Sequence, residues 1–381
     1  MSNYFDYAAA TPMSPIVQKA MEPYFSDQFY NPSAQYLAAQ AVHKDIEKAR
    51  AEVAEILGVR HQEITFTAGG TEANNLAIHG VMARYPGANC IVSAVEHDAV
   101  LEPAANYSYK LAPVKADGRI DLDALATLID DKTILVSVMY ANNEIGTVQP
   151  LAEIAKLLKG IREKRLASPL APEPYPLFFH TDACQAPNCL QILPNTLGVD
   201  MMTLNGGKIY GPKQSGVLFV KTGIELEALV YGGGQEHGKR SGTENVAGII
   251  GFAAALKETA VLRASESARL SELQHSALKF IKKELPNTVF NGAFGYRLPN
   301  NLHITLPGVD NERLMMQLDE QGFMVAVGSA CSASSDEPSH VLRAIGMSDV
   351  DARSSLRITM GRQTTEDDLK ALLSALVDFV K

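Results

Sequence analysis

The chain has 381 residues, of which 46% are hydrophobic and 20% are charged, and its formal net charge is -9. These values describe a globular protein with room for two lobes or one large α/β domain. The negative charge gives no electrostatic reason to expect a nucleic acid or an anionic membrane as a partner. The longest apolar run, near residues 246–256, is far shorter than the ~20 residues that a bilayer requires.

Cysteine usage and the amino terminus indicate a reducing compartment. Cys90, Cys184, Cys189 and Cys331 are too few for a disulfide framework in so long a chain, and none belongs to a CxxC pair typical of structural zinc. The amino terminus lacks a basic region followed by an apolar stretch, so no signal peptide is expected. We therefore expect a cytoplasmic protein with reduced thiols and no bound metal.

The first predicted elements are an extended arm and a helix. Prolines within residues 4–15 disfavour a helix there. Apolar residues recur at spacings of three and four over residues 42–56, which predicts an amphipathic helix that Gly58 ends.

A phosphate-binding turn is predicted next. Residues 64–66 form a short β-rich run that leads through glycines into a helical stretch. Gly70 and Thr71 would hold an anion there, because unpaired N–H groups and the helix dipole face it. Any strand-to-helix turn can show the same pattern, so this motif is only moderately specific.

Two further buried strands end in polar residues. Residues 90–95 lead to His97, which would either stack on a cofactor ring and transfer protons or simply cap the following helix. Residues 134–140 lead to Asn142 and Asn143, which would either donate to a ligand or form a local turn.

The centre of the chain presents an acid and an amine at neighbouring strand ends. An apolar strand at residues 177–182 ends in Asp182, and a second strand at residues 200–204 is followed by a glycine pair and Lys208. Ligands bind at the carboxyl ends of parallel strands. An amine that forms a Schiff base and an acid that keeps a pyridinium nitrogen protonated are the pair that pyridoxal phosphate requires. The alternative is a turn-capping aspartate and a surface lysine.

Several later segments connect these elements. Residues 162–176 carry four prolines and are interpreted as a surface loop. Residues 216–220 form a strand, and the glycine-dense stretch 232–245 is expected to hold a ligand rather than to be disordered. The charge pattern over residues 257–283 predicts a long, partly exposed helix that connects two lobes.

The last third contains a candidate nucleophile and a candidate anion-binding group. Cys331 lies among small residues, which favours a reactive, accessible thiol over an inert core cysteine. Arg357 sits within an apolar strand and needs an anionic partner, either a substrate carboxylate or an internal acid. A capping box at Thr365 begins the final helix.

Taken together, these segments resemble the cysteine desulfurases, and the resemblance covers nearly the whole chain. The most specific motifs are VEHDAV at residues 95–100, NNEIGT at 142–147, DACQ at 182–185, KIYGPK at 208–213, RSGT at 240–243 and GSAC at 328–331. The resemblance implies a homodimeric fold-type I enzyme that uses pyridoxal 5'-phosphate. Its α/β fold would have a large domain (residues 15–255) with a mainly parallel seven-stranded sheet. A smaller α+β domain would comprise residues 1–14 and 256–381.

The resemblance also implies a role for each site residue. Lys208 would tether the cofactor and move protons at the substrate α-carbon, and His97 would stack on the ring. Arg357, with Asn143, would bind the carboxylate of L-cysteine. Cys331 would receive the sulfur as a persulfide, for an iron–sulfur scaffold or another sulfur acceptor. The cofactor would be held by Gly70, Thr71, His97, Asn143, Asp182, Gln185, Asn205 and Lys208, and by Thr243 from the partner subunit.

The sequence departs from the family beside the lysine and leaves alternatives open. Family members usually carry a serine and a histidine just before the lysine, where this chain has Asn205-Gly206-Gly207.

The alternative functions are a selenocysteine lyase, another lyase or aminotransferase with the same fold, or a non-catalytic relative that acts as a scaffold protein.

Overall fold

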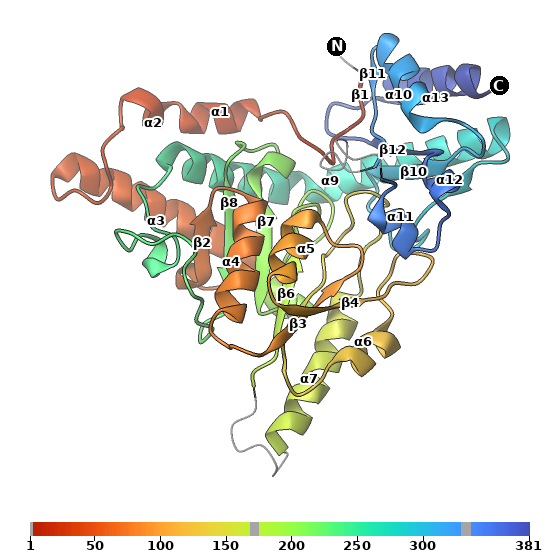
Figure 1. Cartoon of the computed structure of the whole chain (residues 1–381). Helices are drawn as coiled ribbons and strands as arrows, with labels where there is room; N and C mark the ends of the chain where they lie inside the picture. Colours follow the sequence, from red (N-terminus) through yellow and green to blue (C-terminus); the bar gives the residue numbers. More distant parts are fainter. Residues whose placement is uncertain (1–2, 168–174, 329–336) are drawn as a thin grey trace.

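A computed structural model describes residues 3–167, 175–328 and 337–381 of the chain (Figure 1). The strands are β1 (Asn3–Tyr4), β2 (Ile64–Thr67), β3 (Asn89–Ser93), β4 (Ser108–Ala112), β5 (Thr133–Ser137), β6 (Phe178–Asp182), β7 (Met201–Asn205), β8 (Gly216–Val220), β9 (Val289–Phe290), β10 (Asn301–Thr305), β11 (Phe323–Met324) and β12 (Ser355–Thr359). The α-helices are α1 (Pro15–Met21), α2 (Pro23–Ser26), α3 (Leu37–Leu57), α4 (Gly70–Met82), α5 (Asp98–Ala105), α6 (Leu122–Leu128), α7 (Leu151–Ala167), α8 (Pro194–Leu197), α9 (Val246–Glu284), α10 (Asn311–Glu320), α11 (His340–Ala344), α12 (Asp349–Ala352) and α13 (Glu366–Val380). Short 3-10 turns are η1 (His61–Glu63), η2 (Gly206–Lys208) and η3 (Glu236–Gly238).

The central sheet has seven strands in the order β2-β8-β7-β6-β5-β3-β4. Neighbouring strands from β7 to β4 pair in parallel, whereas β8 pairs antiparallel with both β7 and β2. This confirms the prediction of a mainly parallel seven-stranded sheet. Since parallel neighbours point the same way, the loops after β2, β3, β5, β6 and β7 meet at one edge.

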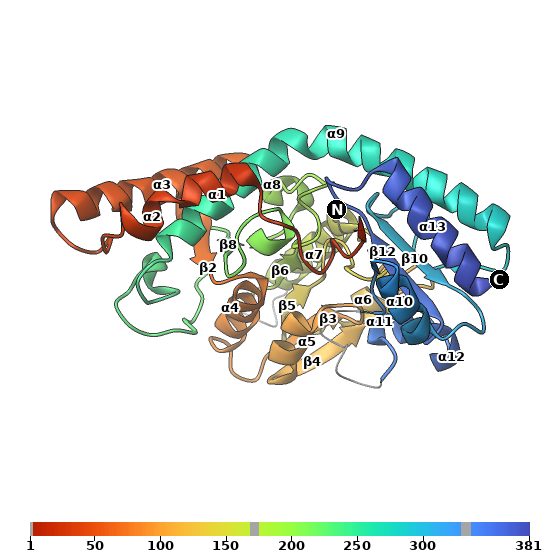
Figure 2. The ribbon, with the colours of Figure 1, turned by 90° about the horizontal axis from the view of Figure 1, so that it is seen from above.

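Helices cover both faces of this sheet (Figure 2). Alternate residues of one strand point to opposite faces. In β3, Ile91 belongs to the apolar cluster that includes α1, α3, α7 and α9, while Cys90 and Val92 belong to the cluster that includes α4 and α5. Strands buried on both sides read as nearly continuous apolar runs, which is why the sequence revealed them.

A second, smaller core lies at the carboxyl-terminal end of the chain. There β12, β10 and β9 form an antiparallel sheet that packs with α10, α13 and the second half of α9. The amino-terminal arm joins this core, because β1 pairs with β11 and Phe5 is part of the cluster. The two cores agree with a two-lobe organisation, although the domain limits inferred from the sequence stay a prediction.

The structure corrects one expectation about the helices and extends another. Residues 162–176 were interpreted as a loop, but α7 continues to Ala167, since its last residues are good helix formers and the prolines come only after them. The helix predicted over residues 257–283 is present, but it begins earlier and includes the apolar run near residues 246–256, so that α9 is a single helix of 39 residues. Among the helices that the structure describes, none combines the length and the apolarity needed to cross a membrane.

A buried ion pair fastens the glycine-dense loop to the central sheet. Two nitrogens of Arg50 in α3 each donate to Glu236 at 2.8 Å, and Glu236 also accepts from the backbone N–H of Phe66 in β2 at 2.7 Å. Both charged side chains are only 4% exposed. Glu236 and His237 have φ angles of 47° and 58°, a strained conformation for such residues that these contacts hold in place.

We predict that Arg50→Met destabilises the protein by about 3–5 kcal/mol, because it leaves the Glu236 carboxylate buried without its partner. Urea unfolding monitored by circular dichroism measures this change. Glu47→Gln is the matched control: this carboxylate also pairs with Arg50 but is 37% exposed, and its loss should cost less than about 1 kcal/mol. Equal effects of the two variants would contradict the prediction.

Candidate active site

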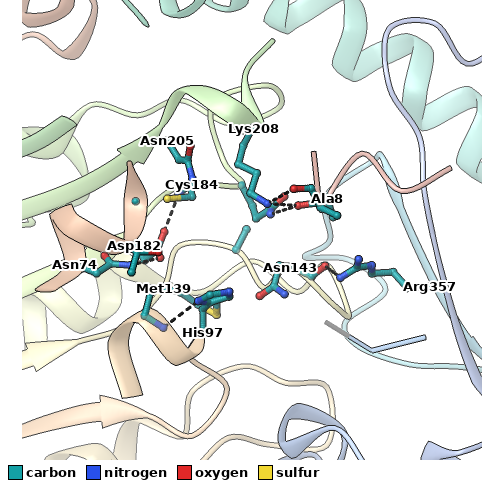
Figure 3. Close-up of a pocket in the computed structure, with 16 residues that line it drawn as sticks. Ala8, Asn74, His97, Met139, Asn143, Asp182, Cys184, Asn205, Lys208 and Arg357 are labelled. Atoms are coloured by element: carbon teal, nitrogen blue, oxygen red, sulfur yellow. Dashed lines mark hydrogen bonds between the residues drawn. The ribbon is translucent and has the colours of Figure 1, made fainter. Parts of the chain in front are cut away.

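A pocket lies at the edge of the central sheet where the parallel strands end (Figure 3). Of the site residues that the family resemblance implies, all those within the described part of the chain line it except Thr243. The lining residues are Ala8, Ala9, Gly70, Thr71, Asn74, His97, Ala99, Met139, Ala141, Asn143, Asp182, Cys184, Gln185, Asn205, Lys208 and Arg357. The loops after five different strands therefore converge with the amino-terminal arm on one space.

Asp182, the last residue of β6, is held by two neutral N–H donors. One carboxylate oxygen accepts from the backbone N–H of Cys184 at 2.9 Å, and the other accepts from the side-chain amide of Asn74 at 2.6 Å. Asn74 is 1% exposed, and it was missed from the sequence. Its spacing of four from Gly70 would have indicated it, because residues four apart share one face of a helix.

Lys208 lies across the pocket from Asp182, and the amino-terminal arm holds its amine (Figure 3). Its Nζ donates to the backbone carbonyls of Ala8 at 2.8 Å and Ala9 at 2.5 Å. Gln185 donates to the same Ala8 carbonyl at 2.9 Å. The interpretation of Lys208 as a solvated surface lysine is therefore wrong, and the arm forms one wall of the site.

The predicted phosphate turn has the close approach that a glycine cradle requires. A Cβ at Gly70 would lie only 2.8 Å from Cys184 Sγ and 3.3 Å from Asn205 Nδ2. Asn205 uses its Oδ1 to accept from the backbone N–H of Gly207 at 2.9 Å. Its amide nitrogen thus lies beside the amino terminus of α4, where the helix dipole favours an anion.

For His97 and the asparagine pair, the structure shows the local capping and turn contacts that the sequence offered as alternatives, and the roles toward a cofactor or ligand stay predictions. His97 Nδ1 accepts from the backbone N–H of Ala99 at 3.0 Å and caps α5, yet the ring also lines the pocket. Asn142 is structural, since it accepts from the backbone N–H groups of Glu144 and Ile145. Asn143, in contrast, lines the pocket.

Arg357 in β12 brings a buried guanidinium to the pocket from the smaller core. It donates to Asp6 at 2.7 Å and to the backbone carbonyl of Asn143 at 3.2 Å. The internal acid considered from the sequence therefore exists. Arg357 lines the pocket, and its Nε atom is buried and has no hydrogen-bond partner among the described residues.

One described site residue stands apart from this pocket, and one predicted site residue is not among the described residues. Thr243 is exposed and does not line it. Cys331 lies outside the described residues, but the chain on both sides of its segment is anchored at the site. Before it, Ala326 pairs with Arg357 through two backbone hydrogen bonds. After it, Ser339 donates to Glu144 at 2.6 Å.

These residues fit pyridoxal phosphate, the cofactor expected from the sequence. The Asp182 carboxylate is buried and both of its hydrogen-bond donors are neutral, which leaves its charge for a cationic ring nitrogen. Lys208 offers an amine in the same pocket, and the turn at Gly70 is too close to its neighbours for any larger residue. Acid, amine and phosphate cradle thus surround a single space.

Comparisons with known proteins agree with this geometry. Residues 3–372 match the family model described as Aminotransferase class-V. A cysteine desulfurase IscS from Dictyoglomus turgidum is 40% identical over 98% of this chain and 93% of its own length. A cysteine desulfurase IscS from Clostridium botulinum strain Hall is 37% identical over 99% of this chain and 94% of its own length. A solved NifS-like protein superposes with a TM-score of 0.90 at 28% identity over 100% and 99% of the two chains. The structure described as SspA in complex with cysteine superposes with a TM-score of 0.78 at 32% identity, and the match covers 94% of this chain and 99% of that chain.

The three cysteines that the structure describes are buried and unsuited to nucleophilic attack. Burial raises the pKa of Cys90 and of Cys189 to about 12. Burial also raises the pKa of Cys184 well above its usual range, and the neighbouring Asp182 carboxylate adds to this. These thiols therefore stay protonated near neutral pH, which leaves Cys331 as the candidate nucleophile.

We predict that Cys90, Cys184 and Cys189 resist alkylation by iodoacetamide at about pH 8, because only the thiolate reacts and the raised pKa of each thiol keeps it protonated. For Cys90 and Cys189, a pKa of about 12 leaves roughly one thiol in 10⁴ ionised. Mass spectrometry of peptides from the folded protein measures the labelling. The same reaction in urea is the control, in which all three should be labelled. Rapid labelling of Cys184 in the folded protein would overturn this assignment.

Proposed function

The chain belongs to the cysteine desulfurases of the class-V aminotransferase family, and on this premise we propose that it converts L-cysteine to L-alanine and leaves the sulfur as a persulfide on Cys331. The observation that carries the proposal is the convergence of Lys208, Asp182 and Arg357 on one pocket. Pyridoxal phosphate supplies the electron-withdrawing ring that carbon–sulfur cleavage needs.

Asp182 and Lys208 divide the work at the cofactor. The Asp182 carboxylate keeps the ring nitrogen protonated, and Asn74 and the N–H of Cys184 hold the carboxylate in place for this role. Lys208 anchors the cofactor aldehyde and then moves a proton at the substrate α-carbon. The carbonyls of Ala8 and Ala9 receive its ammonium when the amine carries the proton.

Arg357 and Asn143 bind the substrate. A carboxylate is a strong acceptor for a buried guanidinium, and Arg357 lines the pocket together with Asn143. Asp6 fixes the guanidinium from the other side through its 2.7 Å contact. The substrate is thereby oriented before its sulfur is attacked.

Cys331 is the sulfur acceptor in this proposal. Its thiolate attacks the sulfur of cysteine, the carbon–sulfur bond breaks, and a sulfur–sulfur bond forms while the carbon fragment takes a proton and leaves as alanine. One cysteine and one thiol give one alanine and one persulfide, so no external oxidant or reductant is needed. The anchoring of the flanking chain at Arg357 and Glu144 supports this role. The outer sulfur of the Cys331 persulfide then passes to an iron–sulfur scaffold or another acceptor protein.

The proposal includes a homodimer in the cytoplasm. Phe25, Phe29 and Leu37 are 68%, 68% and 82% exposed, and an apolar surface of this kind favours burial against a partner. Thr243 is exposed in the single chain, and we assign it to the phosphate in the partner's pocket. Three unpaired cysteines among the described residues support a reducing compartment.

We predict that Lys208→Ala abolishes the visible absorption of bound cofactor and lowers alanine release from cysteine by roughly 10²–10⁴-fold, as expected for loss of a proton-transferring group. Cys331→Ser should keep the absorption but form no persulfide and little alanine. Cys189→Ser, which changes a buried thiol away from the pocket, is the control and should retain both. Purified protein that stays colourless with added pyridoxal phosphate would refute the proposal. A preference for selenocysteine over cysteine would indicate a selenocysteine lyase, and a requirement for a keto-acid acceptor would indicate an aminotransferase.

We further predict complementation between subunits. Lys208→Ala removes the lysine from its own pocket, and Thr243→Asp places a negative charge beside the phosphate in its partner's pocket. A homodimer of either variant should be nearly inactive. A mixed dimer, with one Lys208→Ala subunit and one Thr243→Asp subunit, has one pocket that carries neither change. Equal amounts of the two variants, exchanged and reassembled, should regain about a quarter of the parental activity by random pairing. No recovery in a verified mixed dimer would place Thr243 outside the partner's site.

A further inference from the structure

A second hollow adjoins the cofactor pocket on the side that the proposed function assigns to the phosphate. Gly70, Thr71 and Lys208 line both spaces, so the two are continuous. The wall of the second hollow also includes Gly207 and Lys213. Lys213 had no role in the expectations drawn from the sequence.

The backbone at Gly207 does not require a glycine. Its φ angle is outside the left-handed region, and a Cβ there would lie 3.4 Å from Asn205 Oδ1 and 3.6 Å from Lys213 Cγ. These are ordinary van der Waals distances, unlike the 2.8 Å approach at Gly70. The position therefore leaves open space beside the phosphate cradle, and the side-chain stem of Lys213 borders that space.

Lys213 sits on a loop whose path is fixed by short-range hydrogen bonds. The N–H of Gly206 donates to the carbonyl of Ser215 at 2.9 Å, and the N–H of Gly211 donates to the carbonyl of Gly206 at 2.9 Å. The Ser215 hydroxyl donates to the carbonyl of Pro212 at 2.7 Å. These bonds hold Lys213 opposite Gly207, so that the lysine remains at the hollow.

The charges around the hollow favour an anion. Glu72 is the acid that lines it, and this carboxylate is already engaged by Arg240 at 3.1 Å and by the N–H of Ala68 at 3.2 Å. Lys208 is committed to the amino-terminal arm and, in the proposed function, to the cofactor aldehyde. Lys213 makes no hydrogen bond or ion pair with the residues that the structure describes, so its ammonium remains to attract an anion.

We propose that Lys213 binds the phosphate dianion of the cofactor, with its ammonium in the space that the absent side chain of Gly207 leaves. A lysine is an effective phosphate ligand because its compact charge adapts to different directions of approach. This inference rests on the proposed function, since it requires the cofactor phosphate to bind at the amino terminus of α4. It assigns a phosphate ligand from the loop that follows Lys208.

The test compares two ligands that differ only in the phosphate. Full-length apoprotein is titrated with pyridoxal phosphate and, separately, with pyridoxal, and binding is followed by visible absorption. We expect Lys213→Gln to raise the dissociation constant for pyridoxal phosphate roughly tenfold, the effect of losing one charge-assisted contact, and to leave that for pyridoxal unchanged. Lys213→Arg should retain most of the affinity. Lys159→Gln, at an exposed lysine on α7, is the control.

A second variant tests the use of the open space. Adding Gly207→His to Lys213→Gln should recover affinity for pyridoxal phosphate, because the imidazole enters the same hollow and donates to the phosphate. An unchanged dissociation constant in Lys213→Gln, or an equal loss for both ligands, would overturn the inference. Failure of the parental protein to bind either ligand would instead refute the proposed function, so the two failures are distinguishable.

Discussion

The site depends on one buried carboxylate whose charge is not neutralised by the protein around it. Asp182 accepts two hydrogen bonds, and both donors are neutral. Burial lowers the pKa of nearby His180 to about 4, so its imidazole stays uncharged near neutral pH. Burial also raises the pKa of Glu96 well above its usual range, so this acid stays protonated and adds no competing charge. The negative charge of Asp182 is therefore left for a bound cation, and a protonated pyridine nitrogen supplies one.

The topology explains how groups far apart in sequence meet around this carboxylate. The parallel strands deliver Asp182, His97 and Asn143 to one edge of the sheet, while α4 brings Asn74 and the glycine turn from the loop after β2. The smaller core adds Arg357 through β12. The amino-terminal arm connects these parts, because its carbonyls contact Lys208 and its Asp6 contacts Arg357. Displacing the arm would thus disturb the amine and the guanidinium together.

Sequence patterns predicted the strands, the main helices and the chemically obvious side chains, because buried parallel strands are continuously apolar and polar residues at their ends are conspicuous. Asp182, Lys208 and Arg357 were found in this way. Contacts that depend on the path of the chain were not predictable. The carbonyls of Ala8 and Ala9 have no sequence signature. The pairing of Arg50 with Glu236 joins residues 186 positions apart, and no local pattern connects them.

Helix α9 has a mechanical consequence. Its first half is buried in the large core through residues such as Phe252, and its second half is buried in the small core through residues such as Leu273. At ~1.5 Å per residue, 39 residues make a rod of roughly 58 Å without a proline or a break. Because one unbroken helix is embedded at both ends, a rotation of one lobe away from the other would have to bend it. The helix therefore helps to set the distance between the guanidinium from one lobe and the carboxylate from the other.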